Sequence, residues 1–195
     1  MVPATPIKFL DAPTRTATDG FVIRAYKPGD GAALSVAVCS SYDHLKRFMI
    51  WAKPDQSVEQ SEKLVREFAG KYLASSDFAL GIWTPDEKTL IGATGYHLRD
   101  GPLPLLNAEI GMWIAAGRAR KGLGTAVLRE LIRWGFTDWP WLRLSWWCSG
   151  ANLASRRVAE KAGMKLEGVL RQHRTDPDGT RQDSYIYAAL RGEQK

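Results

Sequence analysis

Hydrophobic residues recur along the chain at two spacings, one typical of strands and one typical of helices. The apolar run at 21–24 predicts a short strand. Asp30 stands where it could cap a helix that reaches about Ser41. Ser57 precedes Gln60 by three residues, a capping-box pattern that predicts the start of another helix. The apolar stripe of this second helix comprises Leu64, Val65, Phe68 and Tyr72.

The centre of the chain predicts strands followed by a helix. Residues 78–83 and 89–98 flank a polar turn and predict a β-hairpin. Another strand is expected over 107–115, and it leads into a loop rich in glycine and arginine. A helix is expected to start near Gly124. Its inner face carries the apolar residues Val127, Leu128, Leu131, Ile132 and Trp134.

The last third of the chain predicts a strand, a helix and a hairpin in that order. Residues 141–147 are strand-like, with alternating apolar residues at Leu142, Leu144 and Trp146. The helix that follows covers 152–162 and is stopped by Gly163, a typical C-cap residue. The final strands are expected at 165–173 and 184–190. Between them lies a turn of suitable residues, Asp176-Pro177-Asp178-Gly179.

The complete order of elements, β-α-α-β-β-β-α-β-α-β-β, predicts a single mixed α/β domain. We expect this domain to occupy residues 21–192. Residues 1–20 are polar and rich in Pro, Thr and Ala, and they are expected to be a loosely ordered N-terminal arm.

The composition is that of an ordinary globular protein, with 195 residues, 45% hydrophobic and 25% charged. No apolar run approaches the roughly 18–20 residues that a membrane-spanning helix needs. The first residues lack the basic region, apolar core and cleavage site of a secretory signal. We therefore expect a cytoplasmic protein without a membrane partner.

The two cysteines do not indicate a metal site or a disulfide framework. Cys39 and Cys148 are far apart, with neither a CxxC motif nor a nearby histidine. A catalytic cysteine would need a histidine partner, and His44 and His173 belong to unrelated segments. Both cysteines are expected to be small apolar residues, and no metal is expected.

The net charge of +6 favours an anionic partner, such as a phosphorylated cofactor, RNA or an acidic protein surface. Part of this charge is concentrated in 118–121 and 171–181. The second stretch could be a solvated hairpin or could receive an acidic acceptor.

The loop after the strand 109–114 carries the most informative pattern in the chain. It reads Arg120-Lys121-Gly122-Leu123-Gly124-Thr125 and leads directly into the expected helix. Such a turn presents backbone N–H groups to an anion, and the start of a helix adds partial positive charge. Arg118 adds a further cation. The pattern favours a diphosphate ligand, although a glycine-rich turn without a ligand is the alternative.

Two other phosphate motifs do not fit this loop. Gly117 and Gly122 have the spacing of P-loop glycines, but Leu123-Gly124 stands where the motif needs Lys and Ser or Thr. Gly122 and Gly124 could begin a dinucleotide fingerprint, but Val127 occupies the place of its third glycine.

The loop resembles the pyrophosphate-binding loop of the GNAT N-acetyltransferases, which is usually written Q/R-x-x-G-x-G/A. A second segment, from Asn152 through Ser155 and Val158 to Gly168, resembles the next motif of that superfamily. This version of the motif, N-x-x-S-x-x-V-x-E-K-x-G-F-x-x-E-G, is characteristic of the branch that acetylates alanine and serine N-termini of ribosomal proteins. The resemblance extends over about residues 20–190. One departure is Ala119, which occupies the Q/R position of the loop.

The resemblance implies a mixed, mostly antiparallel central sheet flanked by helices, with acetyl-CoA as co-substrate. The pantetheine arm would pair with the backbone at Met112, Trp113 and Ile114. The pyrophosphate would be held by the loop residues Arg118, Arg120, Lys121, Gly122, Leu123, Gly124 and Thr125. Asn152 would bind the pantetheine or acyl end, or cap its own helix.

The resemblance also suggests catalytic roles for Ser155 and Glu109. Many members place a tyrosine acid seven residues after the asparagine, where this chain has Ala159. Ser155 shares a helix face with Asn152 and is the expected proton donor to the departing sulfur. Its alternative is a hydrogen bond to its own helix backbone. Glu109 is the candidate base that takes the amine proton, and its alternative is a structural salt bridge.

The expected activity is acetyl transfer from acetyl-CoA to a primary amine by direct attack within a ternary complex. Most of the eight tryptophans are expected in the core, whereas Trp51 and Trp113 could line the acceptor pocket. An N-terminal Ala or Ser of a protein is favoured over a polyamine, amino acid or antibiotic. Alternatives are a longer donor such as succinyl-CoA, a non-catalytic acyl-CoA-binding module and an RNA-binding domain. Relatives often form homodimers, and no nucleic acid is required.

Overall fold

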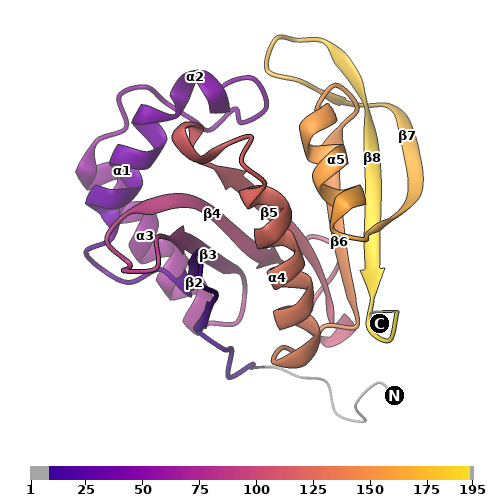
Figure 1. Ribbon diagram of the computed structural model, residues 1–195, viewed down its shortest axis with the longest axis horizontal. Helices are drawn as coiled ribbons and strands as arrows, with labels where there is room; N and C mark the ends of the chain where they lie inside the picture. Colours follow the sequence, from indigo (N-terminus) through magenta and orange to yellow (C-terminus); the bar gives the residue numbers. More distant parts are fainter. Residues whose placement is uncertain (1–8, 194–195) are drawn as a thin grey trace.

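One sheet of eight strands runs through the described part of the chain, residues 9–193 of the computed structural model (Figure 1). The strand order is β1-β2-β3-β4-β5-β6-β8-β7. Every neighbouring pair is antiparallel except β5 and β6, which are parallel. The strands are β1 (Arg15–Ala17), β2 (Val22–Ala25), β3 (Phe78–Trp83), β4 (Leu90–His97), β5 (Asn107–Ile114), β6 (Arg143–Ser149), β7 (Lys165–Thr175) and β8 (Arg181–Leu190). The predicted mixed, mostly antiparallel sheet is therefore confirmed.

Helices cover both faces of this sheet. They are α1 (Gly31–Ser40), α2 (Tyr42–Leu45), α3 (Val58–Leu73), α4 (Leu123–Thr137) and α5 (Leu153–Lys161), with short 3₁₀ turns η1 (Leu103–Leu105) and η2 (Ala116–Arg118). Figure 1 shows α4 and α5 side by side, while α1 and α3 lie together at the other side of the molecule. Each pair of helices packs over its own hydrophobic core.

The larger core lies between the sheet and α4. The expected inner face of α4 is confirmed, because all five of its apolar residues are buried. Aromatic rings fill the space below: Trp139 packs edge-on against Phe78 at 5.0 Å and stacks on Trp141 at 5.7 Å between ring centroids. The Tyr96 hydroxyl donates to the Leu131 carbonyl oxygen at 2.6 Å. The expectation that most tryptophans are core residues holds for this cluster.

The smaller core lies under α1 and α3, and the start of α3 follows the predicted capping box. The Gln60 N–H donates to Ser57 Oγ at 3.2 Å, and the Ser57 N–H donates to Gln60 Oε1 at 2.9 Å. Val65 on the predicted stripe is buried in this core, and Leu64 and Phe68 pack against it as partly buried residues. Tyr72, the last residue of the stripe, is buried in the larger core.

The start of α1 corrects one expectation. Asp30 does precede the helix, but its side chain makes no capping hydrogen bond. Both carboxylate oxygens instead accept hydrogen bonds from the buried Arg24 guanidinium, at 2.7 and 2.9 Å. Oδ2 also accepts from the Lys27 N–H at 3.0 Å. A bidentate charged pair is stronger than a single cap bond, so Arg24 determines how this carboxylate is used.

Part of the segment expected to be an arm is attached to the sheet. Residues 15–17 form β1 and pair antiparallel with β2, with Thr16 opposite Ile23. Just before β1, the carbonyl oxygen of Pro13 accepts a hydrogen bond from the Tyr72 hydroxyl at 2.7 Å. Residues 1–8, the first part of the expected arm, lie outside the described residues. Within residues 9–193, no helix combines the length and apolar character needed to cross a membrane.

The pairing of β5 with β6 determines where a site can form. These strands pair only from Asn107 opposite Arg143 to Glu109 opposite Ser145. Beyond that point β5 continues to pair with β4 as far as Ile114, and β6 continues to pair with β8. The shared edge therefore opens into a wedge. Because parallel strands need a crossover helix, α4 begins beside this opening.

A buried leucine and an exposed leucine should differ greatly in how much their replacement lowers the free energy of unfolding. Leu131→Ala, at a position with 0% exposure, should lower the free energy of unfolding by about 2–5 kcal/mol, because it leaves a cavity. Leu73→Ala, at 81% exposure on α3, should change it by less than about 0.5 kcal/mol. Urea unfolding of both variants measures the difference, and equal losses would contradict the described position of α4.

Candidate functional site

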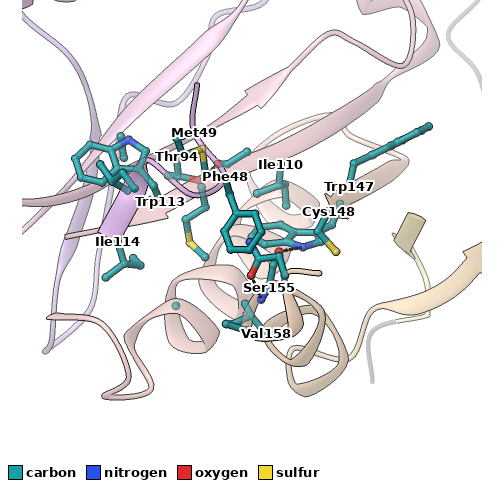
Figure 2. A pocket seen from close by; sticks show the side chains of 18 of the residues that line it. Phe48, Met49, Thr94, Ile110, Trp113, Ile114, Trp147, Cys148, Ser155 and Val158 are labelled. Atoms are coloured by element: carbon teal, nitrogen blue, oxygen red, sulfur yellow. Dashed lines mark hydrogen bonds between the residues drawn. The ribbon is translucent and has the colours of Figure 1, made fainter. Parts of the chain in front are cut away.

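A cleft of ≈ 1470 Å³ occupies the opening between β5 and β6. Its walls come from α1, α2, the loop after α2 and α3, from β4, β5 and β6, and from the first turn of α4 and from α5. In Figure 2, Ile110, Cys148 and Ser155 gather at one end, and Trp113 and Ile114 lie at the other. Ordinary small-molecule pockets measure about 300–1,000 Å³, so this cleft has room for an extended ligand and a second reactant.

The loop before α4 presents its backbone to the cleft. Gly122 adopts a left-handed conformation with φ of 81° and is the N-cap of α4. Among the described residues, no side chain caps this helix. Its first N–H groups, which have no partner within a helix, therefore remain available to an anion. Arg120 also has positive φ, at 62°, a conformation that is rare for residues other than glycine and typical of functional loops.

The structure brings only some of the predicted loop residues to the cleft wall. Those that line it are Arg120, Gly122, Gly124 and Thr125, together with Ala119. Arg118, Lys121 and Leu123 do not line it. The Lys121 ammonium donates to the Gly117 carbonyl oxygen at 3.1 Å, and Leu123 packs against the larger core. Ala119 lacks the Gln or Arg side chain that the family loop has at this position. Of its two neighbouring arginines, Arg118 and Arg120, only Arg120 lines the cleft.

The free edge of β5 forms the next part of the cleft. Met112, Trp113 and Ile114 all line it, as expected. Side chains alternate along a strand, so Met112 and Ile114 face the helices α4 and α5. Trp113 faces the opposite side with Glu109 and Gly111. We call this side of β4 and β5 the acceptor face, after the acceptor pocket that the sequence predicts at Trp51 and Trp113. In the described chain, this edge has no strand partner beyond Glu109, and its backbone groups are open to the cleft.

The start of α5 places two predicted residues together. Asn152 is the N-cap, and its Oδ1 accepts from the Ser155 N–H at 3.0 Å, so the capping alternative for Asn152 is present. Ser155 Oγ accepts a hydrogen bond from Trp146 Nε1 at 3.0 Å, which a dashed line marks in Figure 2. Because an indole N–H can only donate, the hydroxyl keeps its own proton for another acceptor. Both residues line the cleft.

Cys148 lies at the same end of the cleft but is a buried free thiol. Burial raises the pKa of this thiol, which keeps it protonated. Among residues 9–193, no three His, Cys, Asp or Glu side chains gather as a metal site would require.

Glu109 makes the salt bridge that was its alternative role. Its Oε1 lies 2.6 Å from Arg99 Nη1. The glutamate side chain is 14% exposed and the arginine 59%, so the pair stands at the edge of the cleft. Glu109 also lines the cleft on the acceptor face, directly across from His97 of β4.

His97 and its partner Asp77 were not predicted as site residues. His97 Nδ1 lies 2.8 Å from Asp77 Oδ1, and both residues line the cleft. The predicted hairpin held a signal for this pair. Phe78 pairs with Tyr96, so the residues just outside, Asp77 and His97, must be neighbours. His44 also lines the cleft, whereas His173 lies in β7 with its Nδ1 2.9 Å from Ser184 Oγ.

Aromatic rings stand at the other end of the acceptor face. The Trp51 and Trp113 ring centroids are 6.0 Å apart with a tilt of 56°, and both residues line the cleft. The predicted aromatic wall is therefore present. Trp51 is exposed, and it lies in the loop after α2, which also contributes Phe48 and Met49 (Figure 2).

Comparison with known proteins identifies the family. Residues 21–165 match the family described as acetyltransferase (GNAT) domain. This chain belongs to that family. It is therefore an acetyl-CoA-dependent N-acetyltransferase.

Relatives and solved structures agree with this assignment. The uncharacterized N-acetyltransferase YoaA from Bacillus subtilis (strain 168) is 29% identical over 174 residues, covering 89% of this chain and 95% of YoaA. The ribosomal-protein-S5-alanine acetyltransferase from Vibrio fischeri has the same fold, with a TM-score of 0.78, 16% identity and coverage of 94% and 100%. RimL, a ribosomal L7/L12 α-N-protein acetyltransferase in complex with coenzyme A, gives a TM-score of 0.77 at 20% identity, with coverage of 89% and 95%.

The described residues of this GNAT acetyltransferase fit the shape and charge of coenzyme A. Uncapped amides at the start of α4 and the Arg120 side chain suit a diphosphate. The open edge of β5 suits the amides of a pantetheine arm. Ser155 and Ile110 lie where that edge meets β6, which is where the thioester end would reach.

The left-handed conformation of Gly122 predicts a charge-sensitive position. A Cβ here would meet no protein atom within 4 Å, so its effect would fall on the ligand and on the strained backbone. Gly122→Asp should weaken coenzyme A binding by at least about 100-fold, because it sets a carboxylate against the diphosphate. The variant Gly122→Asn carries a side chain of the same shape as Asp without the charge, and Asn tolerates positive φ. It should weaken coenzyme A binding by about tenfold or less. Calorimetric titration with coenzyme A tests this, and equal losses would exclude a charge effect at Gly122.

Proposed function

We propose that this GNAT enzyme acetylates the N-terminal amine of a protein that begins with Ala or Ser. The observation that carries this proposal is the continuity of the cleft, which runs from the amides of α4 through the strand opening to the acceptor face. On that face it is bordered by the exposed residues Asp43, His44 and Arg47 of α2 and the following segment. An open border of this kind admits a peptide, whereas a closed pocket would select a small amine. RimL and the S5-alanine enzyme, which share the fold, are named for ribosomal-protein substrates.

Direct transfer requires both reactants in the cleft together. Acetyl-CoA supplies an activated acetyl thioester. The amide-lined loop before α4 and Arg120 hold the diphosphate, and the edge at Met112, Trp113 and Ile114 aligns the arm. The amine enters from the acceptor face, between the Trp51–Trp113 wall and Glu109. Holding the two groups in this geometry supplies a large share of the rate.

Ser155 supplies the proton for the departing sulfur. The amine nitrogen forms a bond to the carbonyl carbon while the carbon–sulfur bond breaks and its electron pair moves to sulfur. Trp146 donates to the Ser155 oxygen, so the hydroxyl can still donate its own proton to an acceptor at this end of the cleft. Ala159 occupies the position of the usual tyrosine and is fully buried, which leaves Ser155 as the donor at this end.

An amine must lose a proton before it attacks, because most of it is protonated at neutral pH. On the acceptor face, Glu109 is the carboxylate that would attract the ammonium group. Its salt bridge with Arg99 holds it in place at the cleft edge. The group that takes the proton must lie on this same face, within reach of one water molecule.

A thiol-release assay tests the proposed acceptor. Acetyl-CoA is offered with hexapeptides that begin with Ala, Ser or Met, and with spermidine and lysine as small amines. We expect the Ala and Ser peptides to give the highest kcat/KM. Faster turnover of a small amine would overturn the peptide assignment. Coenzyme A binding without turnover of any amine would favour a non-catalytic acyl-CoA-binding module.

The Ser155 role predicts a loss of turnover rather than of affinity. Ser155→Ala should lower kcat by about 10–100-fold, because the sulfur leaves without a proton donor. The coenzyme A Kd should change little. Ser155→Thr keeps the hydroxyl and should retain most of the activity. Stopped assays at saturating acetyl-CoA measure kcat, and unchanged turnover in Ser155→Ala would remove Ser155 from the mechanism.

A further inference from the structure

The acceptor face carries a second polar pair that the scheme above does not use. His97 is the last residue of β4, and Asp77 immediately precedes β3. Their side chains are only 16% and 26% exposed, and they contact each other at 2.8 Å. A mostly buried imidazole beside a carboxylate, lining a reaction cleft, is a candidate for proton transfer.

The imidazole ring of His97 occupies the space next to two glycines. A Cβ on Gly111 would stand 3.0 Å from His97 Nε2, and a Cβ on Gly95 would stand 3.0 Å from Cε1. Gly95 and Gly111 are register partners in β4 and β5. At Gly111 the ring is the nearest group, so a side chain there would displace it, whereas a Cβ on Gly95 would also meet the Phe78 carbonyl oxygen at 2.6 Å. The two glycines therefore leave the space in which the ring extends from Asp77 toward β5.

Nε2 of His97 lies next to Gly111, close to the point where β5 and β6 separate. Gly111 lies two residues after Glu109, the last β5 residue that pairs with β6. Ser155 approaches the same opening from the other side, through its bond to Trp146, which follows the last paired β6 residue, Ser145. His97 and Ser155 therefore flank one opening from opposite faces of the sheet.

The Asp77 carboxylate determines which nitrogen of His97 carries a proton. An ionised carboxylate only accepts hydrogen bonds, so Nδ1 is the protonated nitrogen and Nε2 keeps its lone pair. Within the described residues, Nε2 has no hydrogen-bond partner. A proton acceptor thus faces the cleft at the place where the amine enters.

Glu109 is in a different situation, because one of its oxygens already accepts a hydrogen bond from Arg99 at 2.6 Å. It stands across from His97 in the register and shares the acceptor face. The charged groups next to His97 are Asp77, its partner, and Glu109, its register neighbour, which is paired with Arg99. The cleft lining on the side of α2 adds Asp43, His44 and Arg47.

We propose that His97 is the catalytic base of the acetyl transfer and that Asp77 is its positioning residue. This inference rests on the proposed function. One proton of the ammonium group passes through a water molecule to Nε2 of His97 and then to bulk water. The neutral amine forms the bond to the carbonyl carbon while the carbon–sulfur bond breaks and its electron pair moves to sulfur. Ser155 gives its proton to the sulfur, and the second proton lost by the nitrogen returns through water to the Ser155 oxygen. Glu109, paired with Arg99, attracts and orients the ammonium group.

The pH dependence of His97→Gln tests this role. With an Ala- or Ser-starting hexapeptide at saturating acetyl-CoA, kcat should fall about 100-fold at pH 7. An α-amine has a pKa of about 7.7–8.0 and is mostly neutral at pH 9, so the defect should shrink to about tenfold or less there. A merely structural role would give the same defect at both pH values. A loss below about threefold at pH 7, or a defect that does not change with pH, would overturn the proposal.

Three matched variants separate the roles. Asp77→Asn can donate to Nδ1, which leaves Nε2 protonated, and it should lower kcat about tenfold or more at pH 7. Glu109→Gln should raise the KM for the peptide more than it lowers kcat. A pH-dependent defect in Glu109→Gln, with none in His97→Gln, would assign the proton to Glu109 instead. His173→Gln, at an exposed position on β7, should leave kcat within about twofold.

Nuclear magnetic resonance of the free protein distinguishes failure of this inference from failure of the proposed function. With ¹⁵N-labelled histidine, we expect His97 to carry its proton on Nδ1 and to change tautomer in Asp77→Asn. The experiment needs no acceptor. A proton on Nε2 in the unmodified protein would overturn the base role even if peptides are acetylated. Absence of acetyl transfer to every amine, with the expected tautomer present, would instead refute the acceptor assignment.

Discussion

The early end of pairing between β5 and β6 is the constraint on which the site depends. Each strand keeps its partner on the other side, β4 or β8, so the loss of pairing opens a wedge without loosening the sheet. The parallel direction of this pair requires a crossover connection. Helix α4 is that crossover, and it begins next to the end of β5. The amides of Gly122 and its neighbours and the free edge of β5 therefore converge on one cleft.

The alternation of side chains divides this cleft between two reactants. Neighbouring residues of β5 point to opposite faces, so Met112 lines the side of α4 and α5 while Trp113 lines the acceptor face. The groups proposed to transfer protons follow the same division. Ser155 lies on the helical side, and Glu109 and His97 lie on the other. In the proposed reaction the two reactants meet at the opening, and the backbone of β5 separates the proposed acid from the proposed base.

Local patterns in the sequence predicted the structure well, and patterns that depend on the neighbouring strand did not. The capping box at Ser57 was confirmed because both of its hydrogen bonds are made within four residues. Asp30 stands at the N-cap of α1 as expected, but its side chain makes no capping bond, because Arg24 on β2 donates to both of its carboxylate oxygens. The glycine loop was predicted from its spacing, and Gly122 and Gly124 line the cleft, whereas the side chain of Arg118 does not. His97 was missed because its partner Asp77 is recognisable only from the register of the hairpin.

The glycines of the central strands are explained by the acceptor face rather than by turns. Glycine inside a strand loses more conformational freedom on folding and packs no side chain, so it weakens the strand. Gly95 and Gly111 nevertheless stand opposite each other in the middle of the sheet, where the imidazole of His97 would meet a Cβ at either position and the Phe78 carbonyl oxygen would also meet one at Gly95. The other face of the same strands carries Tyr96 and the buried tryptophans of the larger core. That aromatic packing offsets the cost of the glycines, so one face of the sheet supplies the stability that the reactive face requires.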